Sequence, residues 1–410
     1  MPKPNLPVIR RRLLFKALSW TLRILDKPGL MKQPLETELL IGAARRRARL
    51  NNFGDETFRE PLRRLLDCCE SEARLNTIGK LALAEDILQL LINRLQIQRD
   101  RHKWPRISVE AIVGPLFIVG LPRTGTTLLH GLLAQDHDAF STPTTWEVMF
   151  PSPPPSLGQE GRIKRAKRRL GCFHLLAPEF QKIHPTSADH PQECIAIMSH
   201  TFMSDQFGAM YNIPAYESWL KRQDKRPVYQ FHRQFLQHLQ YGRPARRFVL
   251  KAPHHMLSTE ALFATYPDAL VVQTHREPLE ILPSAASLTA VLRSVFSDFV
   301  DPAAIGNEIT KFWEDALEKF LAARKALRHD AVFDVEYSDL VRNPIEVLRK
   351  IYNWLGRDLS CDVELRIRIY LETNSPSKYG RHSYNLAAFD MDPVNLSERF
   401  GQWPGTRRLH

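Results

Sequence analysis

Short apolar runs alternate along the chain with segments whose apolar residues recur at helical spacing, and this alternation predicts the fold class. The candidate strands are residues 116–119, 247–250, 269–275 and 331–337. Short runs that are apolar along most of their length are typical of strands buried on both faces, as in a parallel sheet. The sequence therefore predicts an α/β fold: a central parallel sheet with P-loop-like topology, flanked by helices.

Two longer stretches show helical patterns without strands. Residues 35–100 read as amphipathic helices, and residues 178–240 read as a helix-rich insert. The aromatic residues of the insert are more often core than binding wall; they are Phe202, Phe207, Tyr211, Tyr216 and Trp219. We expect a basic amphipathic and helical extension over residues 1–104, then an α/β domain over 105–410 with its insert at about 178–240.

The N-terminal segment 10–25 has the pattern of a basic amphipathic helix. Lys16 and Arg23 interrupt its apolar run and no small-residue cleavage site follows, which argues against a secretory signal. Two interpretations stay open: the helix lies on a membrane surface, or it docks on the body of the protein. No run of 18 apolar residues occurs, so we expect no ordinary transmembrane helix. A cytoplasmic protein, with peripheral membrane association as the variant, is the expectation.

The loop after the first predicted strand carries the clearest chemistry. Gly120 and Gly125 have the spacing of a phosphate-binding loop, and a helical pattern begins at Thr126. The backbone N–H groups at a helix N-terminus form an anion site. Thr126 stands where nucleotide triphosphatases have lysine, while Arg123, inside the loop, supplies positive charge. The loop therefore predicts an anion site without the lysine of ATP chemistry.

Two further elements end predicted strands with cations. Lys251 closes the run that begins at Arg247, and Arg276 follows the run 269–275, with Ser284 eight residues later inside the next helix. An arginine and a serine at that spacing can converge on one phosphate. The alternative for Arg276 is a simple salt bridge to Glu277 or Glu280 at the helix start.

These three motifs, in this order, resemble the sulfotransferase superfamily that uses 3′-phosphoadenylyl sulfate (PAPS). The chain is most similar to the bacterial-type branch with the Arg-[Ser/Thr]-Gly-Thr-Thr loop, over roughly residues 35–400. The resemblance implies that residues 105–410 are a catalytic domain. It also implies transfer of a sulfuryl group from PAPS to a hydroxyl or amine, which leaves adenosine 3′,5′-bisphosphate and needs no metal.

The resemblance also assigns donor-binding residues. It implies that the first loop binds the 5′-phosphosulfate of PAPS through Arg123, Thr124, Gly125, Thr126 and Thr127. Arg276 and Ser284 are implied to bind the 3′-phosphate, and Tyr337 to lie near the adenine. Near the C-terminus, Arg381 and Lys378 resemble the basic loop of the branch and are further candidates for the 3′-phosphate.

Catalysis is assigned in part only. Lys251 is implied to contact the bridging oxygen or the sulfuryl group as the donor bond breaks. Glu147 and His255 are both candidates for the general base, and the choice stays open because it depends on geometry. A histidine has a suitable pKa unaided, whereas the pKa of a glutamate must be raised by burial or a neighbouring charge. Glu193, in an Asp-x-Pro-x-Glu element, either lines the acceptor side or caps a helix.

Composition and net charge narrow the classes of partner and the redox compartment that fit this chain. The chain has 410 residues, 43% hydrophobic and 25% charged, with a net charge of +12. Such a charge fits an anionic donor. The basic runs, at residues 10–12, 45–47 and 164–169, come without a nucleic-acid-binding motif, so no nucleic-acid partner is expected. Five scattered cysteines without a CxxC pair suit a reducing compartment.

Two other functions are compatible with a phosphate-binding loop. A P-loop-type kinase or NTPase is disfavoured by Thr126 at the lysine position and by the lack of a convincing magnesium-binding carboxylate. A non-catalytic nucleotide-binding protein on the same fold is disfavoured because the charged motif residues are intact. The partners expected are PAPS and a small-molecule, lipid or glycan acceptor, among which the sequence does not choose.

Overall fold

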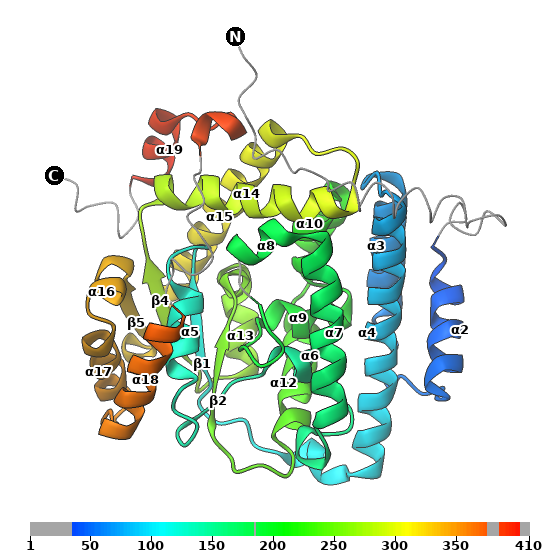
Figure 1. Ribbon diagram of the computed structural model, residues 1–410, viewed down its shortest axis with the longest axis horizontal. Coiled ribbons are helices and arrows are strands. Elements are labelled where there is room, and N and C mark those ends of the chain that lie inside the picture. Colours follow the sequence, from blue (N-terminus) through cyan, green and yellow to red (C-terminus); the bar gives the residue numbers. More distant parts are fainter. Residues whose placement is uncertain (1–34, 184–185, 375–384, 402–410) are drawn as a thin grey trace.

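The computed structural model describes residues 35–183, 186–374 and 385–401, and its centre is a five-stranded sheet (Figure 1). The strands lie in the order β2-β3-β1-β4-β5, and every neighbouring pair is parallel. Their bounds in chain order are Leu116–Gly120, Phe140–Ser141, Arg247–Lys251, Leu270–His275 and Val332–Glu336. The predicted α/β class and parallel sheet are confirmed. β2 was not predicted, because two residues are too few to show a pattern.

The register of the sheet brings the carboxyl ends of the central strands together. Ile118 of β1 lies opposite Lys251 of β3 and Val272 of β4, and Gly120 lies opposite Thr274. The strand order also reverses direction at β1, which has β3 on one side and β4 on the other. In open α/β sheets such a switch point forms a crevice at the carboxyl ends of the strands.

Alternate strand residues face two separate layers of helices. Phe117 and Val119 pack into the cluster with α12 and the helices that follow it, whereas Leu116 and Ile118 pack against the other layer. The first layer contains α12 (Arg226–Gln240), α13 (Thr259–Thr265), α14 (Pro278–Phe296), α15 (Pro302–Arg324) and α19 (Pro393–Phe400). The second contains α5 (Thr126–Leu133), α16 (Tyr337–Arg342), α17 (Pro344–Trp354) and α18 (Cys361–Thr373).

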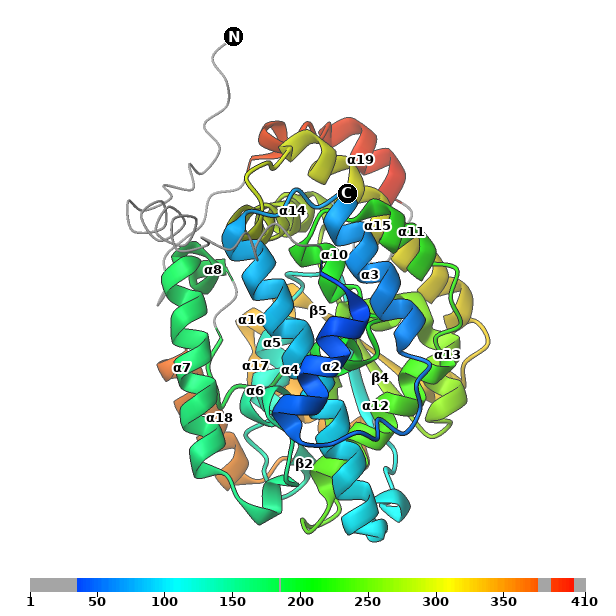
Figure 2. The same cartoon turned by 90° about the vertical axis from the view of Figure 1, so that its right-hand side faces the viewer.

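The described N-terminal helices share a hydrophobic core with the insert (Figures 1 and 2). They are α2 (Thr37–Ala48), α3 (Arg59–Ser71) and α4 (Thr77–Lys103). The insert contributes four of its aromatic side chains to this core, namely Phe202, Phe207, Tyr211 and Tyr216, while Trp219 packs on its edge. The core interpretation of the aromatic insert is therefore confirmed. The basic segment 10–25 lies outside the described residues.

The remaining helices are short, apart from one. They are α6 (Thr145–Met149), α8 (Pro178–Ile183), α9 (Cys194–Met198), α10 (Gln206–Met210) and α11 (Pro214–Leu220), whereas α7 (Glu160–Leu176) spans 17 residues. Short 3₁₀ turns connect several elements, including η2 (Pro105–Val109), η3 (Pro155–Leu157), η4 (Ser199–Thr201), η5 (Pro253–Ser258), η6 (His329–Ala331) and η8 (Leu386–Phe389).

Among the described residues, α14 is the one helix long and apolar enough to cross a membrane by length and composition. Most of its apolar stretch, 78%, is buried inside the protein. It packs on α15, on α4 and on α10. A helix that is apolar all round is expected at the centre of a large fold, and α14 fits that role.

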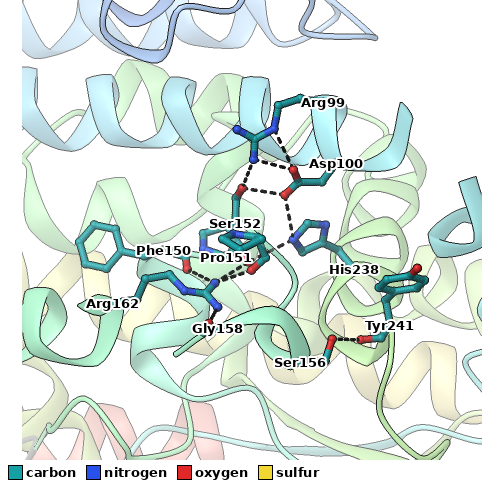
Figure 3. Close-up of polar contacts among 11 residues, drawn as sticks. Arg99, Asp100, Phe150, Pro151, Ser152, Ser156, Gly158, Arg162, His238 and Tyr241 are labelled. Atoms are coloured by element: carbon teal, nitrogen blue, oxygen red, sulfur yellow. Dashed lines mark hydrogen bonds and ion pairs between the residues drawn. The ribbon is translucent and has the colours of Figure 1, made fainter. Parts of the chain in front are cut away.

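A buried polar network fixes the proline-rich segment that follows α6 (Figure 3). Asp100, at the end of α4, accepts hydrogen bonds from Arg99 (2.6 Å) and from Ser152 Oγ (2.6 Å). His238 of α12 donates to the carbonyl of Pro151 (3.1 Å), and Arg162 of α7 donates to the carbonyls of Phe150, Pro151, Pro153 and Gly158. The segment wraps around the Arg162 guanidinium, because this one arginine satisfies several of its carbonyls.

A partly buried acidic pair gives the fold a pH dependence. Glu217 of α11 and Glu308 of α15 lie near Arg293 of α14, which pairs with Glu308 (Nη1 to Oε2, 2.8 Å). Burial, and next the negative charge of Glu308, raises the pKa of Glu217 to about 8. Glu217 in the unfolded chain loses its proton near its ordinary pKa of 4.5, while the folded protein keeps the proton until about pH 8. The contribution of this group to stability therefore falls as the pH rises between these two values.

We expect Glu217→Gln to remove this dependence, because the amide does not titrate. Thermal unfolding of the two proteins between pH 5 and pH 8, followed by circular dichroism, checks it: the stability of the variant relative to wild type should rise steadily across about 3 pH units. A constant difference between the two proteins at every pH would show that Glu217 titrates normally in the fold.

Candidate active site

The loop between β1 and α5 has the backbone shape of an anion-binding loop. Gly120 has φ of 135°, Arg123 has φ of 71° and Gly125 has φ of 89°. A side-chain carbon at Gly120 would lie 2.5 Å from the carbonyl of Thr274, so β4 approaches too closely for any other residue. Because α5 begins at Thr126, its free N–H groups face the mouth of this loop. The helix N-terminus predicted from the sequence is present.

Thr124 points into the protein and holds the loop in place. Its hydroxyl donates to the carbonyl of Leu121 (2.7 Å) and hydrogen-bonds the hydroxyl of Thr274 on β4 (2.6 Å). The Thr124 side chain is buried. Among the loop hydroxyls, Thr124 therefore shapes the loop, while Thr127 is exposed at the start of α5.

Arg276, Tyr337 and Gly125 meet beside the loop. Arg276 Nη1 donates to the carbonyl of Arg123 (3.1 Å), and its guanidinium lies over the ring of Tyr337, 4.3 Å from the centroid. A side-chain carbon at Gly125 would lie 3.0 Å from the same tyrosine ring. Arg276 also pairs with Glu280 (2.8 Å), so the salt bridge weighed from the sequence exists as well. Its exposed partner makes that pair a weak one.

Ser284 lies in the second turn of α14, roughly 9 Å along the helix from its first residue. Its hydroxyl is buried and has no hydrogen-bond partner in the described protein. Buried polar atoms normally have a partner, so an unpaired hydroxyl calls for an explanation. A ligand oxygen would provide one.

Lys251 joins β3 to the start of α5 and to the insert. Its Nζ donates to Thr127 Oγ1 (3.2 Å) and forms an ion pair with Glu193. The Lys251 side chain is 3% exposed and that of Glu193 is 16% exposed. Glu193 occupies the N-cap position of α9, but its side chain makes no capping hydrogen bond. Of the two sequence interpretations, the cap describes the position of Glu193 in the chain, whereas its carboxylate contacts Lys251.

The two adjacent histidines point to different environments. His255 hydrogen-bonds Tyr229 through Nδ1 (2.7 Å) and packs edge-on against Phe117 in the core. Burial, with smaller effects of His232 and His254, lowers its pKa well below the usual value. His254 instead packs on Trp313, with ring centroids 5.2 Å apart.

The charged residues of the site affect the pKa of His254. Burial lowers its pKa, and the charges of Asp205, Glu193 and Lys251 act on it as well. His130, in α5, lies beneath the same lysine: burial, and next the positive charge of Lys251, lowers its pKa to about 3. Both imidazoles are therefore neutral near pH 7, which leaves the cations to set the positive charge of the site.

Glu147 is engaged in local structure. Its carboxylate accepts from the backbone N and the hydroxyl of Thr144 (both 2.8 Å), which forms a capping box at the start of α6. The other carboxylate oxygen pairs with Arg243 (2.6 Å). The structure thus gives Glu147 a full set of partners away from Lys251.

The sequence predicted most of the residues that surround the loop but missed several others. Arg123, Lys251, Arg276 and Tyr337 meet around the loop as expected, while Arg381 and Lys378 lie outside the described residues. The missed features are Thr274, His254 and the contact of Glu193 with Lys251. The Asp-x-Pro-x-Glu element was a usable signal for Glu193. No cluster of potential metal ligands occurs among the described residues.

Comparison with known proteins gives one consistent result. The profile of a family described as "Sulfotransferase family" matches residues 115–360. A curated relative, the omega-hydroxy-beta-dihydromenaquinone-9 sulfotransferase Stf3 of Mycobacterium tuberculosis, is 27% identical over 291 residues, which is 66% of this chain and 70% of its own length. The Stf3 protein of Mycobacterium bovis matches to the same extent.

Solved structures agree. Sulfotransferase STF1 from Mycobacterium tuberculosis H37Rv superposes with a TM-score of 0.80 at 31% identity, covering 90% of this chain and 99% of that one. Sulfotransferase STF9 from Mycobacterium avium has a TM-score of 0.79 at 24% identity, covering 89% and 95%, which shows a shared fold.

The buried ion pair predicts a specific pattern of stability losses. Glu193→Gln or Lys251→Met alone leaves one buried charge without its partner, and we expect each to cost about 3 kcal/mol, the low end for a buried pair. The double variant should cost clearly less than the sum of the two. Urea unfolding of all four proteins checks this, with Lys350→Met as an exposed control. Additive losses would mean that the two residues do not interact.

Proposed function

Because this chain belongs to the sulfotransferase family, we propose a residue-level account of how it moves a sulfuryl group from PAPS to an acceptor hydroxyl or amine. The observation that carries the account is the hydrogen bond from Lys251 to Thr127 (3.2 Å), which joins a lysine of β3 to the first turn of α5. Transfer leaves adenosine 3′,5′-bisphosphate, so negative charge develops on the departing phosphate. A buried cation beside a helix N-terminus supplies the fixed positive charge that stabilises it.

The donor is held by the groups around the loop. The N–H groups of Thr126 and Thr127, together with Arg123, would bind the phosphosulfate end. Arg276 and the unpaired Ser284 hydroxyl would bind the 3′-phosphate, and the ring of Tyr337 would lie near the adenine. The orphaned hydroxyl is the structural feature that fits this assignment most directly, because a phosphate oxygen would satisfy it.

We assign the general base to Glu193 in preference to Glu147 and His255. Both oxygens of Glu147 are engaged by Thr144 and Arg243, and His255 faces Tyr229 in the core. Glu193 touches Lys251, so its carboxylate lies where the acceptor and the reacting donor have to meet. When Lys251 turns to the donor, the carboxylate of Glu193 would exchange this lysine for the acceptor hydroxyl and accept its proton.

The acceptor that the relatives favour is a lipid hydroxyl. Stf3 is named for its action on a hydroxylated menaquinone, which is a lipid. Small alcohols, phenols and glycans are the alternatives that an acceptor screen has to include. The insert, which shares a core with the N-terminal helices and contributes Glu193 beside Lys251, would shape the acceptor pocket (Figure 1).

The donor assignment is tested by calorimetry with adenosine 3′,5′-bisphosphate, in the presence of a chelator and with ATP for comparison. We expect metal-free binding that is much tighter than ATP binding and that is lost in Arg276→Ala. Weak binding beside magnesium-dependent binding of ATP would favour a kinase or NTPase. Tight binding without sulfate transfer to a broad acceptor panel would favour a non-catalytic protein.

Lys251→Ala is expected to lower turnover by about 10² to 10³ while changing donor affinity much less, because its charge acts mainly in the transition state. Initial rates with radiolabelled PAPS and calorimetry on the same preparation measure the two effects. His130→Gln provides a control for a buried polar change beneath the same loop. Full turnover in the alanine variant would remove Lys251 from the mechanism.

The three base candidates are separated by their pH profiles. Glu193→Gln should abolish the acid limb of the kcat profile and lower kcat by about 10² to 10⁴, the usual contribution of a general base. Glu147→Gln and His255→Gln should keep that limb and lose stability instead. Rates are measured below the unfolding temperature of each variant. An acid limb that vanishes only in His255→Gln or only in Glu147→Gln would transfer the role to that residue.

A further inference from the structure

We propose that the outward face of α7 is a docking surface for an anionic lipid membrane. The surface consists of five exposed side chains of this helix: Lys164, Lys167, Arg168, Cys172 and Leu175. They recur at helical spacing and so share one side of the helix. α7 is an outer helix at one flank of the molecule (Figure 2).

The charge of α7 is poorly neutralised inside the protein. The helix carries six cations, Arg162, Lys164, Arg165, Lys167, Arg168 and Arg169, and one acid, Glu160. Arg169 pairs with Asp86 and Lys167 with Asp189, but Lys164 and Arg168 have no acidic partner in the part of the chain that the structure describes. Like charges at these spacings destabilise a helix, so an anionic partner would relieve a cost that the fold itself leaves in place.

The contacts of Arg162 and Arg165 show that some cations of α7 bind the rest of the protein while others face solvent. Arg162 points inward to backbone carbonyls, and Arg165 lies over the ring of Phe150 at 4.1 Å while donating to Gln89. Burial, and next the charges of Arg169 and Arg47, lowers the pKa of Arg165. These cations hold the helix in place, whereas Lys164 and Arg168 are left to face outward.

The last turns of α7 change from charged to apolar. Leu175 is 65% exposed, and Cys172 is exposed one turn before it. Behind them, the rings of Phe173 and Phe180 pack on each other at 5.1 Å. A surface that pairs several cations with an exposed leucine is suited to anionic lipid, because the cations meet headgroups while the leucine enters the apolar boundary. Nucleic acid would use the cations and leave the leucine in water.

The position of α7 connects this surface to the rest of the molecule. α8 follows α7 after one residue and packs on α14, the helix that carries Ser284. If α7 lies on the bilayer, only α8 separates it from α14, which carries Ser284 of the proposed donor site. The proposal itself concerns membrane binding and holds for any acceptor, so it does not depend on the proposed function.

Flotation of the full chain with vesicles tests the proposal. One set of vesicles contains phosphatidylcholine alone, and in the other phosphatidylglycerol replaces a third of it. We expect binding to the anionic vesicles only. Lys164→Gln/Arg168→Gln should weaken it about 30-fold, since each cation near an anionic surface is worth about five-fold. The matched control, Lys325→Gln/Lys350→Gln, removes two exposed cations from elsewhere and should bind as wild type does.

Two further variants separate the alternatives. Leu175→Ser should weaken vesicle binding about ten-fold, because the leucine no longer enters the membrane. Arg10→Gln/Arg12→Gln should change binding less than the α7 pair does. The proposal is overturned if the α7 pair binds anionic vesicles like wild type, if both vesicle types bind equally, or if only the N-terminal pair matters. Tighter binding to a DNA oligonucleotide, lost in the α7 pair and unchanged in Leu175→Ser, would identify the surface as a nucleic-acid site instead.

Discussion

A lysine cation buried at the end of β3 is the constraint on which the site depends. Removing a cation from water is costly unless an anion and hydrogen-bond acceptors receive it. Lys251 finds both, in Glu193 at the start of α9 and in Thr127 at the start of α5. Through these two contacts, Lys251 attaches the insert to the sheet and also attaches the donor loop to the sheet. A change on either side alters the position of the other.

The donor loop is fixed by an equally local requirement, the close approach of β1 and β4. Thr274 lies opposite Gly120 in the register, and its hydroxyl meets that of Thr124. There is no room for a side chain at Gly120, and the two hydroxyls satisfy each other within the core. The loop is thus preorganised by the sheet, so its N–H groups can meet a ligand without rearrangement of the loop backbone.

The sequence predicted the parts of this structure that rest on local pattern. Four strands were apparent as apolar runs, and the glycines, Lys251 and Arg276 could be placed at strand ends because parallel strands share a carboxyl edge. The base could not be chosen, since adjacent residues His254 and His255 turn to opposite environments for reasons of tertiary packing. The capping box of Glu147 was readable in advance, because Thr-x-x-Glu is its recognised pattern.

Two of the cations assigned to the donor, Arg276 and Lys251, already have carboxylate partners, and these two partners differ in a way that affects binding. Glu280, beside Arg276, is 58% exposed, whereas Glu193, beside Lys251, is 16% exposed. An exposed pair is weak, so a 3′-phosphate can displace Glu280 at little cost. Separating the buried pair costs more, because each charge then needs a new partner. Donor affinity should therefore come mainly from the Arg276 side. The exchange at Lys251 should be driven by the phosphosulfate end, and it should let the Glu193 carboxylate take the acceptor hydroxyl in place of Lys251.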